Sequence, residues 1–223
     1  MTMKPGILAL WNNCAEEGRI EYERWYMKEH LPERINVPGF RFGRRYIRLE
    51  GDREYFTFYE TDSVDVLWSP AYMRRLSNPT EWTQNVMNYF RDTIRTVCCR
   101  ETSVGYATGG HVTTFRFSGT RVLGASDIQN ISRIILNTIS KQDGFCRSQL
   151  WASTAKQTPS DTAETKIRGA DEMLSWAVII ESTNEGMARS IANDLEFGQR
   201  LRNVDRLSKY DVGVYCLTCI MTR

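Results

Sequence analysis

Tyr22, Tyr26 and His30 recur at every fourth position of a stretch whose pattern is typical of a helix. That spacing places the three side chains on one helix face. A histidine next to a tyrosine can transfer a proton near neutral pH, because the unperturbed imidazole pKa is about 6.5. We interpret the three residues as the wall of a small-molecule pocket, with His30 and Tyr26 as its catalytic pair.

Both catalytic candidates also have a purely structural interpretation. A histidine near a helix C-terminus can cap the last carbonyl groups; the helix dipole there favours imidazolium, whereas burial favours the neutral ring. A tyrosine can equally line a core with its hydroxyl at the edge. The sequence leaves these alternatives open.

Other aromatic and basic side chains of the first half could complete the pocket. Arg44 shares a face of an expected strand with Tyr46, opposite Arg45, and could hold a carboxylate or enolate. Aromatic rings suit a flat ligand and equally suit sheet packing. The residues expected to bind substrate are Tyr22, Trp11, Arg44, Tyr46, Tyr59, Trp68, Tyr72 and Trp82.

Composition excludes several classes of protein. The 223 residues are 41% hydrophobic, which is enough for sizeable cores, and the formal net charge is +2 without a block of like charge. A surface for nucleic acid would be strongly basic. The opening apolar run is far shorter than the roughly 18 residues of a membrane span. We therefore expect a cytoplasmic protein that binds neither nucleic acid nor membrane.

Neither the cysteines nor the second histidine indicates a metal site. The six cysteines lack a secretory context, so we expect reduced thiols. Cys216 and Cys219 fall on an expected strand, where their spacing sends the sulfurs to opposite faces. His111 lacks a carboxylate or histidine at ligand spacing. We therefore expect no metal, haem or other cofactor.

The first half is expected to run strand, helix, strand, strand, helix, strand. Pro32 should end the first helix at Leu31, and Pro38-Gly39 should turn the chain into the second strand. Ser69-Pro70 and Asn78-Pro79 are typical of helix starts. The expected strands are 7–11, 42–49, 55–59 and 96–103, and the main helices are 16–31 and 78–95.

The same order begins again after a glycine-rich break at 105–110. Ser126 and Gln129 indicate a capping box, and a later helix should start near Asn184. The expected strands are 111–117, one following Phe145, 176–181 and 212–221. The residues expected to face inward from the two helices are Ile128, Ile131, Ile135, Ile139, Met187, Ile191 and Leu195.

Two landmarks indicate an internal repeat. Phe145 lies 105 residues after Phe40, and His111, which opens the second half, lies 105 residues after Gly6, next to the first strand. We expect one unit at 1–104 and a second at 111–223. The polar segment 155–170 has no counterpart of that length in the first unit, so we interpret it as a mobile loop or lid.

The order βαββαβ, found twice, describes the ferredoxin-like unit. Each unit has a sheet with helices on one face and an apolar, uncovered opposite face. Two such faces can cover each other. The predicted fold is α+β, with two tandem ferredoxin-like units packed sheet to sheet as a pseudo-dimeric α+β barrel.

The chain resembles the EthD-like branch of the dimeric α+β barrel superfamily. The resemblance covers roughly the first hundred residues and is most specific at Tyr22, Tyr26, His30 and Pro32; Pro38-Gly39-Phe40, Arg44-Arg45-Tyr46, Tyr55 to Glu60 and Ser69 to Tyr72 also fit. At the offset of 105, Ile131 and Ile135 stand where the first half has Tyr26 and His30. We therefore expect the reactive site in the first half and a degenerate site in the second.

The resemblance implies a small-molecule enzyme but leaves the reaction open. Its superfamily includes cofactor-free monooxygenases, isomerases, polyketide cyclases, dehydratases, decarboxylases and haem enzymes. We expect cofactor-independent acid–base chemistry of the lyase, dehydratase, cyclase or isomerase type on an aromatic or polyketide-like substrate. A cofactor-free monooxygenase and a non-catalytic small-ligand binding protein stay open as alternatives, and the fold is compatible with a homodimer of the whole chain.

Overall fold

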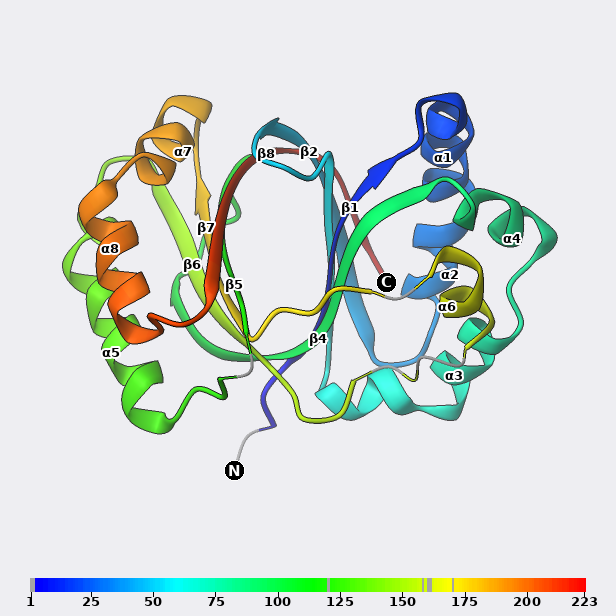
Figure 1. The fold of residues 1–223 in the computed structure, drawn as a ribbon, viewed down its shortest axis with the longest axis horizontal. Helices are drawn as coiled ribbons and strands as arrows, with labels where there is room; N and C mark the ends of the chain where they lie inside the picture. The colour runs from blue at the N-terminus through cyan, green and yellow to red at the C-terminus, as the bar shows by residue number, and fades with distance from the viewer. Residues whose placement is uncertain (1–2, 120, 158, 160–161, 170) are drawn as a thin grey trace.

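A computed structural model describes residues 3–119, 121–157, 159, 162–169 and 171–223. The strands in this part of the chain are β1 (Gly6–Cys14), β2 (Phe40–Glu50), β3 (Tyr55–Thr61), β4 (Phe90–Gly105), β5 (His111–Ser118), β6 (Phe145–Ser153), β7 (Trp176–Ser182) and β8 (Lys209–Thr222). They form a closed barrel in the order β1-β3-β2-β8-β5-β7-β6-β4. Helices cover its outer surface on two opposite sides (Figure 1).

The helices of the described residues fall into two groups. The first half contains η1 (Glu16–Gly18), α1 (Arg19–Trp25), η2 (Tyr26–His30), α2 (Leu31–Ile35), η3 (Val64–Trp68), α3 (Pro70–Ser77) and α4 (Glu81–Met87). The second contains α5 (Ala125–Asn137), η4 (Ile139–Lys141), α6 (Ala163–Arg168), α7 (Glu185–Ala192) and α8 (Leu195–Val204). Of the second group, α6 lies among the helices of the first half (Figure 1).

The strand order confirms the predicted fold. Within the barrel, β4-β1-β3-β2 and β8-β5-β7-β6 are the same arrangement, and all the ladders between them are antiparallel. Two further antiparallel ladders, β2 with β8 and β4 with β6, join the halves. The two ferredoxin-like sheets therefore supply each other's missing edge partners as well as covering each other's inner faces.

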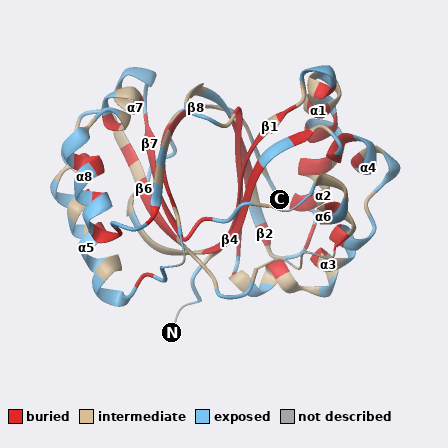
Figure 2. Cartoon of the chain, in the orientation of Figure 1, coloured by how far each residue is buried: buried red, intermediate tan, exposed pale blue. Residues whose placement is uncertain are grey.

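The apolar pattern of the strands explains three separate cores. Every residue of β3 and β7 is buried, because one face of each strand lies inside the barrel and the other lies under helices. One apolar cluster fills the barrel, and one lies between each half of the sheet and its helices. Figure 2 shows this burial along the strands and on the inward sides of the helices.

The two halves share the geometry of the corner that enters their second strand. Gly39 and Gly144 have φ values of 91° and 87°, a left-handed conformation that favours glycine. The ladders that follow are irregular at equivalent places, between Phe40 and Phe42 and between Phe145 and Arg147. The offset of 105 predicted from the sequence therefore joins equivalent positions of the backbone.

The predicted end of the first helix at Leu31 is wrong. The chain continues through Pro32 to Ile35 as α2, after a π-helical turn in which the Leu31 N–H donates to the Tyr26 carbonyl. Pro32 thus falls in the first turn of a new α-helical segment, where a residue without an N–H is tolerated.

Four other predictions about helices are corrected. The helix expected to reach residue 95 ends at Met87, because pairing with β1 makes the following residues a strand. Thr80 caps that helix in place of Asn78. The next helix begins at Ala125, with Gly124 as its N-cap, and not at the expected capping box; the Gly124 N–H donates to Asp127. Leu195 is exposed, because α7 ends at Ala192 and Leu195 is the first residue of a separate helix, α8.

The segment 155–170 differs from a simple loop. It includes α6, which is capped by the Thr162 hydroxyl accepting from the Thr165 N–H. On either side of α6 the chain follows β4: the Thr154 N–H donates to the Val97 carbonyl, and the Arg95 N–H donates to the Glu172 carbonyl. These backbone hydrogen bonds therefore hold part of the second half against β4 of the first half. Among the described residues, no helix is both long and apolar enough to span a membrane.

The division into units at 1–104 and 111–223 stays a prediction, which expression of the first unit alone would test. We expect residues 1–104 to form a dimer or to be insoluble, because their sheet would expose the apolar face that now lines the barrel. Size-exclusion chromatography with light scattering is the measurement. A stable, soluble monomer would contradict the prediction, and the full chain is the control.

Candidate functional site

The side chains of Tyr26 and His30 lie between the helix layer and the outer face of the first sheet. Both are buried. The His30 ring packs on Trp25, with centroids 4.3 Å apart, and meets the Tyr26 ring edge-on at 5.1 Å. The π turn that carries Tyr26 and His30 is a kind of helix irregularity often found at functional sites. Neither residue is a solvent-exposed helix cap.

One buried polar atom of this region, the His30 Nδ1, has no hydrogen-bond partner among the described residues. The Tyr26 hydroxyl interacts with the hydroxyls of Thr57 and Tyr59. Burial raises the pKa of Tyr26 and of Tyr59, so both hydroxyls stay protonated at neutral pH. Unpaired buried polar groups are costly, and functional sites are among the places where proteins retain them.

Three arginines surround the same region and set the charge state of the imidazole. Burial lowers the pKa of His30 well below its ordinary value, and the charges of Arg34, Arg168 and Arg95 lower it further. At pH 7 the ring is therefore neutral, with Nδ1 unpaired. A neutral imidazole can accept a proton from a ligand.

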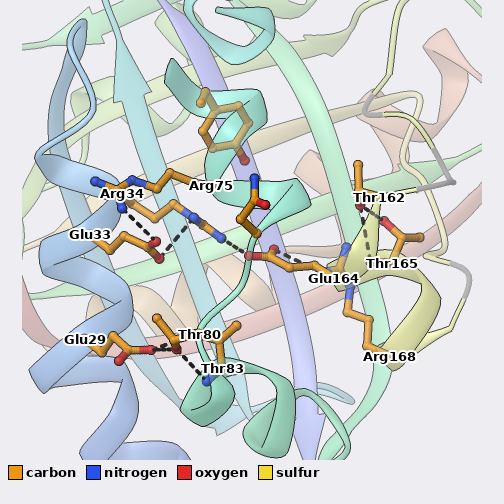
Figure 3. Close-up of polar contacts among 12 residues, drawn as sticks. Glu29, Glu33, Arg34, Arg75, Thr80, Thr83, Thr162, Glu164, Thr165 and Arg168 are labelled. Atoms are coloured by element: carbon orange, nitrogen blue, oxygen red, sulfur yellow. Dashed lines mark hydrogen bonds and ion pairs between the residues drawn. The ribbon is translucent and has the colours of Figure 1, made fainter. Parts of the chain in front are cut away.

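Arg34 stays charged in spite of its burial. Burial is the largest single influence and disfavours its charged form, but Glu164, Glu33 and the neighbouring tyrosines together outweigh burial, so the pKa of Arg34 is raised. The Arg34 Nη2 donates to Glu164 Oε1, and Arg34 Nη1 lies 3.3 Å from Glu33 Oε2. Figure 3 shows Arg34 between these two carboxylates, one from α2 and one from α6. A fully buried ion pair thus links the two halves.

These groups enclose a small internal cavity of about 10 Å³. Such a volume is near the minimum for one water molecule. The cavity is lined by His30, Arg34, Tyr59, Tyr72, Arg95, Glu164 and Arg168, together with Leu8, Leu10, Met87 and Phe90. The arrangement combines a neutral base, cationic groups and aromatic walls in a space closed by α6.

Some of the predicted site residues lie on the other face of the sheet. Trp11, Tyr46 and Arg44 point into the barrel, where Trp11 and Tyr46 pack on Phe56 at 4.6 and 5.2 Å. Arg44 is held by Glu181, with Nη1 2.8 Å from Oε2. The structure therefore does not bring these three residues to His30.

The neighbouring arginine, Arg45, faces the helix layer instead. Its guanidinium carbon lies 4.7 Å from the centroid of the Tyr26 ring and 5.4 Å from that of Tyr22. It also pairs with Glu23 at 2.5 Å. Strand alternation predicts these opposite directions for Arg44 and Arg45, but it does not say which face carries the site.

The other predicted aromatic residues lie at varying distances from the cavity. Tyr59 and Tyr72 line it. Tyr22 belongs to the same core, and its hydroxyl donates to Asn12 Oδ1 at 3.2 Å. Trp68 and Trp82 are partly buried at the edge of this core, and Trp82 donates to Glu21. These three rings support the site from outside the cavity.

Sequence analysis missed four charged residues of the site: Arg34, Arg95, Glu164 and Arg168. Arg34 follows His30 by four residues, so the spacing that links Tyr22, Tyr26 and His30 could have found it. Glu164 and Arg168 come from the segment that crosses between the halves. Nothing in the local sequence indicates that crossing.

The residues present do not fit a haem or a metal ion. The His30 ring is packed on Trp25, and the positive charges of three arginines at this imidazole disfavour an iron or other metal cation there. In the described residues, no group of three or more His, Cys, Asp or Glu side chains could hold a metal ion. The chemistry that these residues can carry out therefore involves neither a metal nor a haem.

Comparisons with known proteins identify the fold. No protein-family model matches the sequence, and no curated protein matches it. Structural similarity covers nearly the whole chain. A candidate monooxygenase from Lactobacillus acidophilus matches with a TM-score of 0.57 and 11% identity, over 98% of this chain and 96% of that one.

Two further structures give similar results. An anthrone oxidase-like protein matches with a TM-score of 0.65 and 7% identity, over 98% of this chain and 93% of that one. A candidate chlorite dismutase matches with a TM-score of 0.55 and 13% identity, over 97% and 96% of the two chains. The chain thus has the ferredoxin-like, dimeric α+β barrel fold of these neighbours.

The predicted lyase, dehydratase, cyclase or isomerase activity is wrong on this comparison. The three neighbours carry names of oxidative enzymes, which favour the alternative of a monooxygenase.

The lowered pKa of His30 predicts a specific pH dependence of stability. Below about pH 6.5 the unfolded chain takes up a proton at this residue and the folded chain does not, so the free energy of unfolding falls by up to about 1.4 kcal/mol per pH unit. We expect His30→Gln to remove this contribution. Urea denaturation from pH 5 to pH 8 measures it, with His111→Gln as the control; equal slopes in wild type and His30→Gln would contradict the assignment.

Proposed function

We propose that the chain is a cofactor-independent oxygenase that acts on an aromatic or polyketide-like substrate beside His30, where the present cavity of about 10 Å³ widens to admit it. The observation that carries this proposal is the buried, unpaired Nδ1 of His30 in a region lined by arginines and aromatic rings. The oxidative names of proteins with the same fold support it.

The side chains divide the work of such a reaction in a simple way. His30 is neutral at pH 7 and takes a proton from an activated methylene or phenolic group. Arg34 and Arg95 favour the resulting anion, because they place positive charge in a site that excludes water. Tyr26 and Tyr59 offer protonated hydroxyls to a substrate oxygen. The anion is the species that O₂ can oxidise.

The atoms balance without an external reductant. A methylene group of the substrate becomes a carbonyl, one oxygen atom of O₂ enters the product, and the other leaves as water. The substrate supplies all the electrons that reduce O₂.

We also propose that the two halves arose by tandem duplication and that the first belongs to the EthD-like branch. Equivalent glycines at φ 91° and 87° and equivalent ladder irregularities support the duplication. The series Tyr22, Tyr26, His30 and Pro32 supports the branch. The second half has isoleucines in the corresponding places, so it contributes to the fold and has no matching site.

Oxygen uptake with a panel of phenolic and methylene-activated aromatic compounds, beginning with anthrone, tests the function. We expect the wild type to consume O₂ in the presence of a chelator, and His30→Gln to lower the rate by about 10²–10⁴-fold, the usual loss on removing an acid–base group. His111→Gln is the matched control and should retain the rate.

Three outcomes would count against this function. Equal rates for wild type and His30→Gln would exclude His30 as the base. Saturable binding without O₂ uptake would favour the non-catalytic binding protein. Activity that is lost with the removal of a stoichiometric metal, or a Soret band in the active protein, would replace the cofactor-independent mechanism.

A further inference from the structure

The Glu164 carboxylate contacts Arg34 in the way that the carboxylate of a bound ligand would. The two side chains are 2% and 4% exposed, and they come from segments 130 residues apart. The Glu164 carboxylate points from α6 toward the Arg34 guanidinium (Figure 3) and lines the cavity beside His30. A carboxylate thus enters the site from outside the first half and pairs with a cation that belongs to it.

The segment that carries Glu164 has little conformational stability of its own. α6 has only six residues, which is too short for a stable isolated helix, so it depends on tertiary contacts. Ile167 packs against the first-half core, and Arg168 pairs with Asp171 at 2.6 Å. On its outer side a groove of about 500 Å³ runs between α6 and the start of α4. α6 therefore separates an open groove from the closed cavity.

Without the Glu164 carboxylate, the buried Arg34 guanidinium would favour the binding of another anion. Of the ion pairs among the described residues, Arg34 would retain the 3.3 Å contact with Glu33, and Arg168 would lose its 3.8 Å contact with Glu164. Arg95 also carries positive charge in this region. A buried cation with an incomplete set of partners is strongly destabilising. A planar guanidinium suits a carboxylate in particular, because it presents paired donors.

We propose that Arg34 is the anion-binding group of the site and that Glu164 occupies the place of a ligand carboxylate. The ligand class is an aromatic carboxylate, because the walls beside Arg34 are the rings of Tyr59, Tyr72 and Phe90. The Arg34 guanidinium already lies 5.7 Å from the Tyr72 centroid. The incoming carboxylate displaces Glu164, and α6 moves outward to make room for the ring. The inference rests on the proposed function only in placing the substrate in this cavity.

Calorimetric binding of 2-naphthoate and of its neutral counterpart 2-naphthamide tests the proposal. Glu164→Gln preserves shape but removes the competing charge, so we expect 2-naphthoate to bind about tenfold more tightly than to wild type, and 2-naphthamide to change by less than about twofold. In the double variant with Glu164→Gln and Arg34→Met, 2-naphthoate should no longer bind more tightly than 2-naphthamide. This double variant contains no uncompensated charge at the pair, so its folding does not depend on the ligand.

Glu33→Gln is the matched control. It removes one negative charge beside the same guanidinium but leaves α6 in place, so its gain for 2-naphthoate should stay below about threefold. An equal gain in Glu33→Gln and Glu164→Gln would reduce the effect to general charge and overturn the proposal.

Hydrogen exchange of the wild type gives a second measurement that requires no variant. Saturating 2-naphthoate should speed exchange in α6 while slowing it in α2. Slower exchange in α6 would show that the ligand binds without displacing it and would overturn the proposal. Binding of 2-naphthoate through Arg34, together with no O₂ uptake on any compound of the phenolic and methylene-activated panel, would retain this inference and reject the oxygenase. O₂ uptake with no preference for the acid would do the reverse.

Discussion

The structure depends on the need of each four-stranded sheet to cover two apolar faces with only one layer of helices. A single ferredoxin-like unit leaves one face and two strand edges uncovered. The second unit supplies both, because its inner face packs on the first and the ladders of β2 with β8 and β4 with β6 close the barrel. Closure buries β3 and β7 on both faces and leaves the barrel interior filled with packed apolar side chains.

Because side chains fill the barrel interior, the candidate site lies outside the barrel. The barrel contains Trp11, Phe56 and Phe58 in close contact, and the Arg44–Glu181 pair there joins the two halves. The outer, helix-covered face of the first half holds the His30 imidazole, whose Nδ1 has no partner among the described residues. The second half has an apolar core at the corresponding place, which includes Ile131 and Ile135. Two halves with the same strand order thus have helix-covered layers of different polarity.

The asymmetry extends to the segment 155–170. It belongs to the second half in sequence, but it follows β4 and places α6 on the first half, where Glu164 meets Arg34. A homodimer would have to make such an exchange twice by symmetry. A single chain with two unlike halves can close one site and leave the other as core.

The sequence by itself determined the periodic features of this protein. Alternating strands, the capped helix after Ser69, the glycine corners at Gly39 and Gly144 and the offset of 105 are local or repeated patterns, and they predict the βαββαβ order, the barrel and the shared face of Tyr22, Tyr26 and His30. Helix ends were less certain, since pairing with β1 overrides helical propensity after Met87 and a π turn carries the helix past Pro32.

Only the tertiary structure decided which groups meet. Arg44 and Arg45 differ by one position, and the direction of the whole sheet settles that Arg45 faces the tyrosines and Arg44 faces Glu181. The pKa of His30 depends on burial and on arginines from three separate segments. The pairing of Arg34 with Glu164 spans 130 residues. Electrostatics and burial depend on distances in space, and a local pattern carries no information about partners that the fold brings from elsewhere in the chain.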